Sequence, residues 1–313
     1  MNPLSSLFGA GVGLRNALYD RGILKIHRLS RPVVSIGNIS VGGSGKTPFV
    51  IALGELLKQR GIAFDVLSRG YGRNSHDLAV VDAGGSPAQF GDEPLLIARA
   101  LHAPVIVGPD RYQAGLFAEG RFSSRIHLLD DGFQHRRLHR DFDIVMLPAS
   151  DLEDTLLPVG RLREPVSALR RADVVAHGAD TAVPGWVKAE WLVRREIRLD
   201  PPFQPGVAFC GLARPAQFFA GVRELAQGNL VATIAFPDHH RYSQSDIERL
   251  LAAKTAGQAE CFITTEKDQM NLGDLAARLR PLKIARLKMV LETPDRALDC
   301  LLETLERRCS CRF

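Results

Sequence analysis

The first half of the chain alternates short apolar runs with segments in which apolar residues recur at helical spacing. Six of the runs predict buried strands, at residues 33–37, 63–67, 104–107, 126–129, 144–147 and 174–176. Strands that alternate with helices in this way are typical of a parallel sheet with helices on both faces. Ligands bind such sheets beyond the carboxyl ends of the strands. The pattern therefore predicts an α/β fold with its site at those strand ends.

The same alternation resumes in the second half, after a stretch rich in proline and glycine. This stretch, residues 184–206, has little helical periodicity, so we place a domain junction there. After it, the pattern predicts strands at 207–210, 230–235 and 261–264 and helices at 216–225 and 244–254. Ser243 and Asp246 predict a capping box before the second of these helices. We therefore expect a core domain over residues 31–180 and a smaller α/β domain over residues 181–313.

The N-terminal segment, residues 1–30, has an amphipathic pattern. Apolar residues recur at near-helical spacing, at Leu4, Leu7, Phe8, Leu14 and Leu18, and basic residues accompany them, at Arg15, Arg21, Lys25 and Arg28. This arrangement suits a helix that lies in a membrane interface. A helix packed on the protein's own core would show the same stripe. No apolar run approaches the roughly 18 residues that span a bilayer, so an integral membrane protein is excluded.

Composition and charge narrow the class of partner. The 313 residues are 45% hydrophobic, which is enough for sizeable cores and excludes wholesale disorder. A net charge of +5 favours phosphates, nucleic acid or anionic lipid as ligands. Basic clusters occur at residues 69–73 and 135–140, but they lack the interleaved aromatic residues of a base-stacking surface, so we expect no nucleic-acid partner. Five cysteines, with no CxxC pair, predict no disulfide framework.

A glycine-rich loop is the strongest chemical signal. It follows the predicted strand 33–37, opens a helix, and consists of Gly42, Gly43, Ser44, Gly45, Lys46 and Thr47. Backbone N–H groups of such a loop surround nucleotide phosphates, the lysine binds the β and γ oxygens, and the threonine hydroxyl ligates Mg²⁺. The general signature has glycine where this chain has Ser40. A purely structural glycine turn is the alternative, but it does not account for Lys46 and Thr47 together.

Two adjacent carboxylates, Asp130 and Asp131, follow the predicted strand 126–129. The carboxyl end of a buried strand is where P-loop proteins place the carboxylate that holds Mg²⁺. Adjacent carboxylates also repel each other unless a cation or donor lies between them. The alternative is an ordinary strand-end turn, in which aspartate and glycine are common.

Three further acidic or histidine positions have more than one interpretation. Asp92 precedes a helical pattern and is either a helix N-cap or the base that accepts a proton from an attacking hydroxyl. Glu164 lies between arginine-rich neighbours, and is either near the metal or in a solvated ion pair.

In Asp238-His239-His240, neighbouring side chains on an extended segment point to opposite faces, so we expect the histidines not to share a metal. An aspartate that orients a histidine for proton transfer is the preferred interpretation, and a surface turn is the alternative.

These motifs together resemble one family. They are VGGSGKTP at 41–48, SRGYGR at 68–73, GDEP at 91–94, DDGFQH at 130–135, REP at 163–165, DHH at 238–240 and TEKD at 265–268. In order and spacing, over most of the chain, they closely resemble the tetraacyldisaccharide 4'-kinases.

The resemblance implies an ATP- and Mg²⁺-dependent kinase that phosphorylates the 4'-hydroxyl of a tetraacyldisaccharide 1-phosphate, a lipid A precursor. It also implies a P-loop core, Asp92 and His239 as a catalytic pair assisted by Lys46, and Mg²⁺ near Thr47, Asp130 and Asp131. A peripheral location is implied, on the cytoplasmic face of the bacterial inner membrane and against its anionic surface. We expect a monomer.

A different class of P-loop protein is the main alternative. A GTPase or a partitioning ATPase at the membrane would use hydrolysis as a switch. A guanine-binding motif has one residue between its lysine and aspartate, but here Asp268 directly follows Lys267. The spacing therefore favours the kinase.

Overall fold

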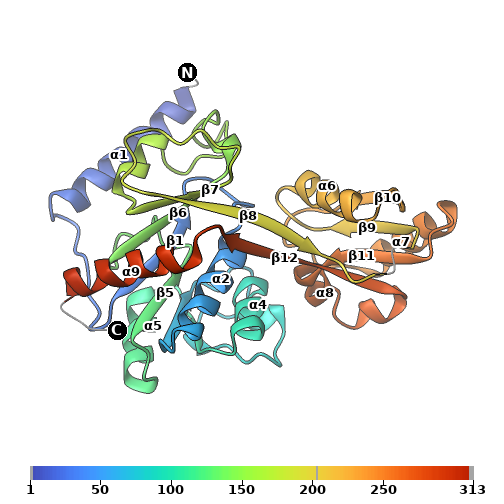
Figure 1. Ribbon diagram of the computed structural model, residues 1–313, viewed down its shortest axis with the longest axis horizontal. Helices are drawn as coiled ribbons and strands as arrows, with labels where there is room; N and C mark the ends of the chain where they lie inside the picture. Colours follow the sequence, from blue (N-terminus) through green and yellow to red (C-terminus); the bar gives the residue numbers. More distant parts are fainter. Residues whose placement is uncertain (1–2, 202–203, 310–313) are drawn as a thin grey trace.

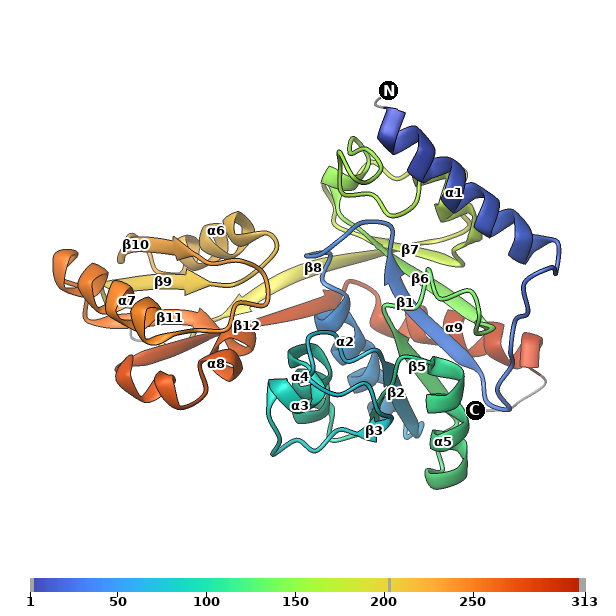
Figure 2. The same cartoon turned by 180° about the vertical axis from the view of Figure 1, so that it is seen from behind.

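One sheet runs through both lobes of the molecule (Figures 1 and 2). The computed structural model describes residues 3–201 and 204–309, and within these residues twelve strands form the sheet in the order β10-β9-β11-β12-β8-β7-β6-β1-β5-β2-β4-β3. The first seven strands of the chain form the sheet of the first lobe, and the last four strands form that of the second lobe. The two long strands β8 and β12 join the lobes.

The first lobe has the parallel sheet that the apolar runs predict. Its strands are β1 (Val33–Asn38), β2 (Phe64–Ser68), β3 (Ala79–Val80), β4 (Val105–Val107), β5 (Ile126–Asp130), β6 (Phe142–Leu147) and β7 (Val174–His177). Only the edge strand β3 pairs antiparallel. β1 lies between β5 and β6, and all six of its residues are buried because helices cover both faces. The six predicted strands are confirmed.

Helices cover the first sheet on both faces. They are α1 (Pro3–Asp20), α2 (Lys46–Gln59), α3 (Pro87–Phe90), α4 (Asp92–Leu101) and α5 (Arg111–Arg121), with short 3₁₀ helices η1 (Ala149–Asp151) and η2 (Val166–Arg171). Helices α2 and α4 pack with the C-terminal helix α9 (Pro294–Cys309) in one apolar core, and α5 packs on the opposite face. This arrangement leaves the carboxyl ends of β1 and β5 open toward the second lobe.

The second lobe is a smaller α/β unit, as predicted. It contains β9 (Gly206–Cys210), α6 (Pro215–Leu225), β10 (Leu230–Ala235), α7 (Gln244–Ala256), β11 (Cys261–Thr265), α8 (Glu266–Leu272) and η3 (Gly273–Arg278). The predicted capping box is confirmed, because Ser243 and Asp246 bond to each other's backbone N–H groups at the start of α7.

The sequence does not predict the two strands that join the lobes. β8 (Glu190–Arg198) begins beside β7 and ends in the second lobe, while β12 (Leu282–Leu291) begins beside β11 and returns. They pair antiparallel, with Leu291 opposite Val193. α9 then packs on the first lobe, although the sequence places it in the second domain. The predicted domain boundary near residue 180 therefore lies just before β8, along which the chain first crosses between the lobes. The chain crosses back along β12.

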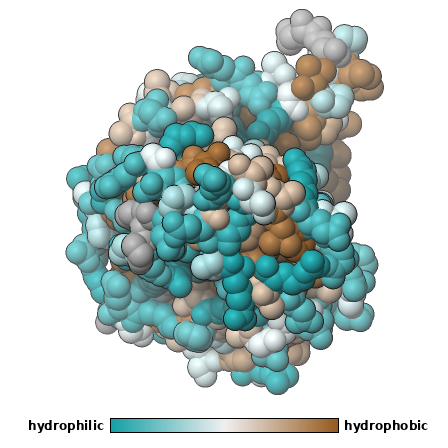
Figure 3. Space-filling model, turned by 90° about the vertical axis from the view of Figure 1, so that its right-hand side faces the viewer, coloured by the Kyte–Doolittle hydropathy of each residue, from teal (hydrophilic) through white to brown (hydrophobic). Residues whose placement is uncertain are grey.

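Helix α1 lies on the outside of the first lobe. None of its residues is buried, and it is attached by polar contacts such as Ser5 Oγ to the carbonyl of Leu156 (2.8 Å) and Arg136 to Asp20 (2.6 Å). In Figure 3 its free end projects beyond the rest of the surface and carries a group of brown, hydrophobic residues. Among the residues described, no helix combines the length and apolar character needed to cross a membrane. Residues 1 and 2 of the predicted amphipathic segment lie outside that range.

Candidate active site

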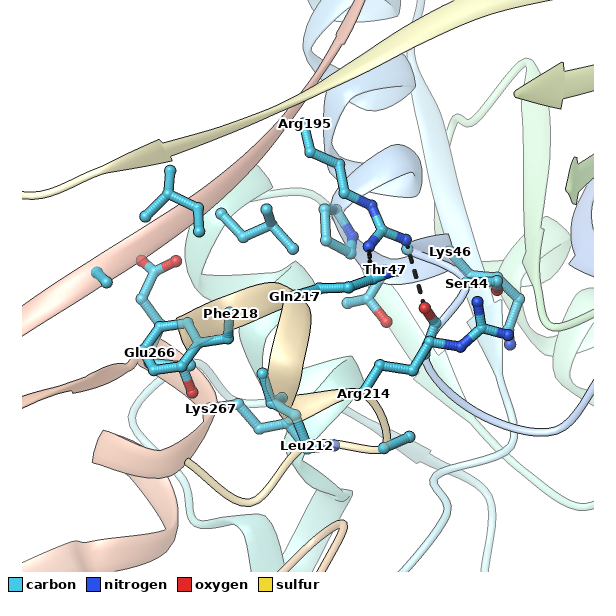
Figure 4. Close-up of a pocket in the computed structure, with 18 of the residues that line it drawn as sticks. Ser44, Lys46, Thr47, Arg195, Leu212, Arg214, Gln217, Phe218, Glu266 and Lys267 are labelled. Atoms are coloured by element: carbon cyan, nitrogen blue, oxygen red, sulfur yellow. Dashed lines mark hydrogen bonds between the residues drawn. The ribbon is translucent and has the colours of Figure 1, made fainter. Parts of the chain in front are cut away.

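A cavity of about 460 Å³ lies between the lobes at the carboxyl end of β1 (Figure 4). The first lobe contributes the glycine-rich loop, the start of α2 and the start of α4. The second lobe contributes β8, the loop after β9, the loop after β10 and the start of α8. The lining residues that carry polar chemistry are Ser44, Lys46, Thr47, Asp92, Glu93, Arg195, Arg214, Gln217, Glu224, Asp238, His239, Glu266 and Lys267.

The glycine-rich loop has a backbone that side chains would disturb. Gly42, Gly43 and Gly45 have φ values of 67°, 59° and 87°, in the left-handed region that glycine adopts without strain. A Cβ on Gly43 would also lie only 2.8 Å from Cγ of Arg214. The loop leads directly into α2, whose first N–H groups have no partner within the helix and can bind an anion. The loop therefore has the backbone conformation and the position that the predicted phosphate-binding loop requires.

Ser40, the departure from the general loop signature, has a structural role. It is fully buried, and its Oγ donates to Oδ2 of Asp151 (2.6 Å). The other oxygen of Asp151 accepts from Arg214 of the second lobe (2.7 Å). The serine thus ties the start of the loop to an ion pair between the lobes.

The paired aspartates have different environments. Asp130 ends β5 opposite Ile36 of β1, and its Oδ2 accepts from Ser68 (3.0 Å). Its Oδ1 is buried and has no protein partner. Asp131 is held by Arg163 through two hydrogen bonds (2.8 and 3.0 Å), and Lys46 Nζ lies 3.4 Å from its Oδ1. Lys46 and Arg163 therefore hold the carboxylate of Asp131, whereas the carboxylate of Asp130 keeps one unpaired oxygen.

The pKa values of the two aspartates differ accordingly. Burial, with the nearby charges of Glu93 and Asp131, raises the pKa of Asp130 to about 7. Burial also opposes ionisation of Asp131, but Lys46 and Arg163 outweigh it and hold the pKa of Asp131 below its usual range. A bound cation would pair with the free oxygen of Asp130 and would offset the burial and negative charge that oppose its ionisation. Asp130 therefore fits Mg²⁺, a cation that prefers oxygen ligands and retains waters.

Across the cavity, His239 meets Asp92. Its Nδ1 lies 2.8 Å from Oδ2 and 3.0 Å from Oδ1 of Asp92. His239 has a left-handed backbone (φ 56°), and the ring of Tyr71 packs beside its imidazole at 5.2 Å. The N-cap of α4 is Gly91 rather than Asp92, so the helix-cap interpretation of Asp92 is wrong. His240 points elsewhere and contacts Asp246 (3.0 Å), so the histidines lie apart as predicted, although a turn at 238–239 rather than an extended segment separates them.

The contact between the lobes shifts the pKa values of both Asp92 and His239. Burial raises the pKa of Asp92, but the hydrogen bond from His239 and the charge of Lys267 more than offset it and lower the pKa to about 2. For His239, burial and Lys267 lower the pKa, while the hydrogen bond to Asp92 raises it above the ordinary value. Asp92 is therefore an ionised acceptor at neutral pH, although it is nearly buried.

Two arginines that sequence reasoning missed reach the phosphate loop from the second lobe (Figure 4). Arg195 on β8 donates to the carbonyl of Gly43 (3.3 Å) and to Gln217. Arg214 pairs with Asp151, and its buried Nε lies beside Gly43 without a partner. The only sequence signal for Arg214 is its place between a strand and a proline that opens a helix.

Glu164 and the basic cluster 135–140 have structural partners. Glu164 is buried and pairs with Arg171 (2.6 Å) rather than with the adjacent arginines in sequence. Arg136 anchors α1 through Asp20, and Arg140 binds Asp143 (2.8 Å). No cluster of three or more His, Cys, Asp or Glu side chains arranged for a metal occurs in the described part of the chain. Within the described residues no disulfide joins the cysteines, which are Cys210, Cys261, Cys300 and Cys309.

A phosphate loop at the end of β1, a carboxylate at the end of the adjacent strand and a carboxylate–histidine pair across the cavity define a P-loop phosphotransferase. The family model of tetraacyldisaccharide-1-P 4'-kinase matches residues 1–306. The tetraacyldisaccharide 4'-kinase of Koribacter versatilis is 51% identical over 98% of this chain and 99% of its own. The enzyme of that name from Geobacter metallireducens is 39% identical over 96% of each chain. The chain therefore belongs to the tetraacyldisaccharide 4'-kinase family.

A solved structure agrees with this assignment. The crystal structure of the "apo" form of LpxK from Aquifex aeolicus in complex with ATP superposes with a TM-score of 0.79 and 36% identity, over 97% of this chain and 98% of that one. The predicted P-loop core is confirmed, and so is the kinase: the chain is an ATP-dependent 4'-kinase of lipid A synthesis. The comparisons do not favour the alternative of a hydrolytic switch.

Proposed function

We propose that Asp92 accepts the proton of the sugar 4'-hydroxyl while the γ-phosphoryl group of ATP passes to the hydroxyl oxygen. The single observation that carries this assignment is the Asp92–His239 contact of 2.8 Å on the wall of the cavity that the phosphate loop also lines. A carboxylate within reach of the hydroxyl is what phosphoryl transfer to an alcohol requires.

The nucleotide phosphates bind the loop from Gly42 to Gly45 and the side chain of Lys46. Lys46 now faces Asp131, and its ammonium can instead neutralise charge on the transferring group. Apolar residues extend the cavity away from the loop, at Ile51, Leu96, Ile197, Leu212, Phe218, Leu225 and Leu287, and suit the base of the nucleotide. The cavity therefore has a charged end for phosphates and an apolar end for a ring.

Thr47, Asp130 and Asp131 would hold the Mg²⁺ that accompanies ATP in this family. The unpaired Oδ1 of Asp130 supports this assignment, and Thr47, which opens α2, supplies a hydroxyl at the same end of the cavity. Bound Mg²⁺ supplies positive charge that offsets the negative charge of the phosphates.

The reaction is balanced by one proton transfer. The hydroxyl oxygen forms a bond to the γ-phosphorus, the bond from that phosphorus to the bridging oxygen of ADP breaks, and Asp92 takes the hydroxyl proton. His239 donates Nδ1–H to the carboxylate and so orients it. Because Asp92 belongs to the first lobe and His239 to the second, the contact between the lobes holds the pair in place.

The lipid substrate supports a peripheral position at the cytoplasmic face of the inner membrane. Leu4, Leu7 and Leu14 of α1 are 59%, 73% and 62% exposed, and their exposed apolar surface can enter the membrane interface. Basic residues just after α1, such as Arg21 and Lys25, can contact anionic headgroups.

The test is incubation of the purified chain with ATP, Mg²⁺ and tetraacyldisaccharide 1-phosphate in mixed micelles. We expect a lipid product heavier by one phosphoryl group, and its loss in the Asp92→Asn variant. Phosphate released from ATP without any change in the lipid would contradict the proposal. Full turnover by Asp92→Asn would leave the kinase intact but remove Asp92 as the base.

A further inference from the structure

The TEKD segment at 265–268 contains two side chains that anchor helix α8. Thr265 accepts from the backbone N–H of Asp268 (3.1 Å) and donates to its Oδ2 (2.6 Å). Asp268 is fully buried, and its Oδ1 accepts from the N–H of Gly211 and the hydroxyl of Tyr242, both at 2.8 Å. These bonds fix the start of α8, so that Lys267 projects into the cavity (Figure 4).

Lys267 contacts both members of the catalytic pair. Its Nζ lies 3.4 Å from Oδ2 of Asp92, 3.4 Å from Nε2 of His239 and 3.1 Å from Oδ1 of Asp238. The side chain is only 13% exposed, so water screens its charge weakly. One ammonium thus contacts the carboxylate of the first lobe and the imidazole of the second.

The chemistry of these donors assigns the tautomer of His239. An ammonium group has three hydrogens to donate and no lone pair to accept with. Nε2 must therefore present its lone pair to Lys267, and the hydrogen of the neutral ring must lie on Nδ1. Nδ1 is the atom that faces Asp92 at 2.8 Å, so Lys267 favours the tautomer in which His239 donates to the base.

Lys267 also balances the acidic groups around His239. Asp92 faces the ring from α4, and Asp238 of the same loop lies 3.8 Å from Nε2. Both carboxylates favour the protonated form of His239. The ring of Tyr71, which also packs beside it, adds no negative charge. Lys267 on α8 is the cation that opposes protonation of the ring. Without it, two carboxylates would act on His239 with no opposing charge.

We propose that Lys267 is a positioning residue for the Asp92–His239 pair: it favours the tautomer with the imidazole hydrogen on Nδ1 and opposes protonation of Nε2. The proposal deepens the proposed function and rests on Asp92 as the base. Lys267 acts electrostatically: it exchanges no proton with the substrate and works only through Asp92 and His239, which it contacts.

The first test is the pH profile of kcat/KM for Lys267→Met. Lys267 lowers the pKa of both Asp92 and His239, so its removal raises both. Turnover that needs both groups unprotonated is then lost at higher pH, and the acid limb should move up by about one to two pH units. Lys267→Arg, which keeps the charge, should restore the wild-type limb. The matched control Lys254→Met, at a half-buried lysine of α7 whose Nζ donates to the carbonyl of Arg280, should not move it.

The second test measures His239 directly, by NMR of ¹³C-labelled histidine in the whole protein without substrate. The pKa of His239 should rise in Lys267→Met and stay unchanged in Lys254→Met. If the methionine variant has a lower melting temperature, Lys267→Gln repeats the measurement. An unchanged acid limb and an unchanged pKa of His239 in the folded variant would overturn the proposal. Because the NMR measurement needs no turnover, it separates this failure from a failure of Asp92 as base.

Discussion

The first lobe builds the phosphate-binding part of the site from two adjacent strands, whereas the second lobe contributes side chains from several separate segments. The phosphate loop follows β1 and Asp130 ends β5, and these strands pair directly. In the second lobe the polar residues are Arg195 on β8, Arg214 after β9, His239 after β10 and Lys267 on α8. The loop and Asp130 are brought together by strands of one lobe, whereas the base pair takes one residue from each lobe.

This difference shows that the crossing strands β8 and β12 set the position of the second lobe against the first. β8 and β12 pair over six residues of each, so they act as a two-stranded connection between the lobes. Across it, Arg214 lies against Gly43 and His239 against Asp92. The position of one lobe relative to the other therefore decides whether the second half of the site meets the first.

Lys46→Ala tests the first lobe's half of the site and has the largest expected effect on turnover. Loss of one charge that faces the transferring group should lower kcat by about 10²- to 10³-fold. The melting temperature should change little, because Lys46 faces the cavity and Arg163 still holds Asp131. The matched control Lys188→Ala, at an exposed lysine, should keep turnover. Near-normal activity of Lys46→Ala would break the assignment of the phosphate loop.

Arg214→Ala tests the contact between the halves. Asp151 is 0% exposed, and truncation of Arg214 leaves its carboxylate without the cation that pairs with it. Loss of one member of such a pair should lower the free energy of unfolding by about 3 kcal/mol, seen as a lower denaturation midpoint. The double variant with Asp151→Ala should cost less than the two single losses added. Additive losses would mean that the pair does not couple the lobes.

Leu7→Gln tests the exposed surface of α1 and has the smallest expected effect. Leu7 is 73% exposed, so the protein's stability should not change, while binding to anionic vesicles should weaken by roughly tenfold. Leu116→Gln, the same change at another exposed leucine, should leave vesicle binding unchanged. Equal binding by both variants would favour a helix that only packs on its own protein.

Continuous motifs made the first half predictable from sequence. The apolar runs predict β1 and β5, and the glycine loop and Asp130 follow them directly in the chain. Ser40 was the only departure, and its reason is a bond to Asp151, more than a hundred residues away. A local motif carries its own geometry, but it does not record such a distant partner.

The second half could be predicted only in part. His239 lies in a recognisable DHH motif, and the family resemblance implies Asp92 as its partner, but nothing local in the chain indicates the pairing. β8 escaped prediction because only Trp191 and Val193 of its residues are buried, charged residues occupy its middle at 194–196, and prolines surround the segment. Arg195 and Lys267 are chemically ordinary in sequence, and only the antiparallel pairing of β8 and β12 and the anchored start of α8 direct them into the cavity.

The most direct test of a base assembled across the lobes is a double-mutant cycle of Asp92→Asn and His239→Gln, with kcat measured at saturating ATP. General-base assistance contributes about 10²- to 10⁴-fold, so each single variant should lose turnover in that range at an unchanged melting temperature. If the two groups act as a unit, the double variant should be little worse than the poorer single variant. Losses that simply multiply, or full turnover by Asp92→Asn, would contradict the account.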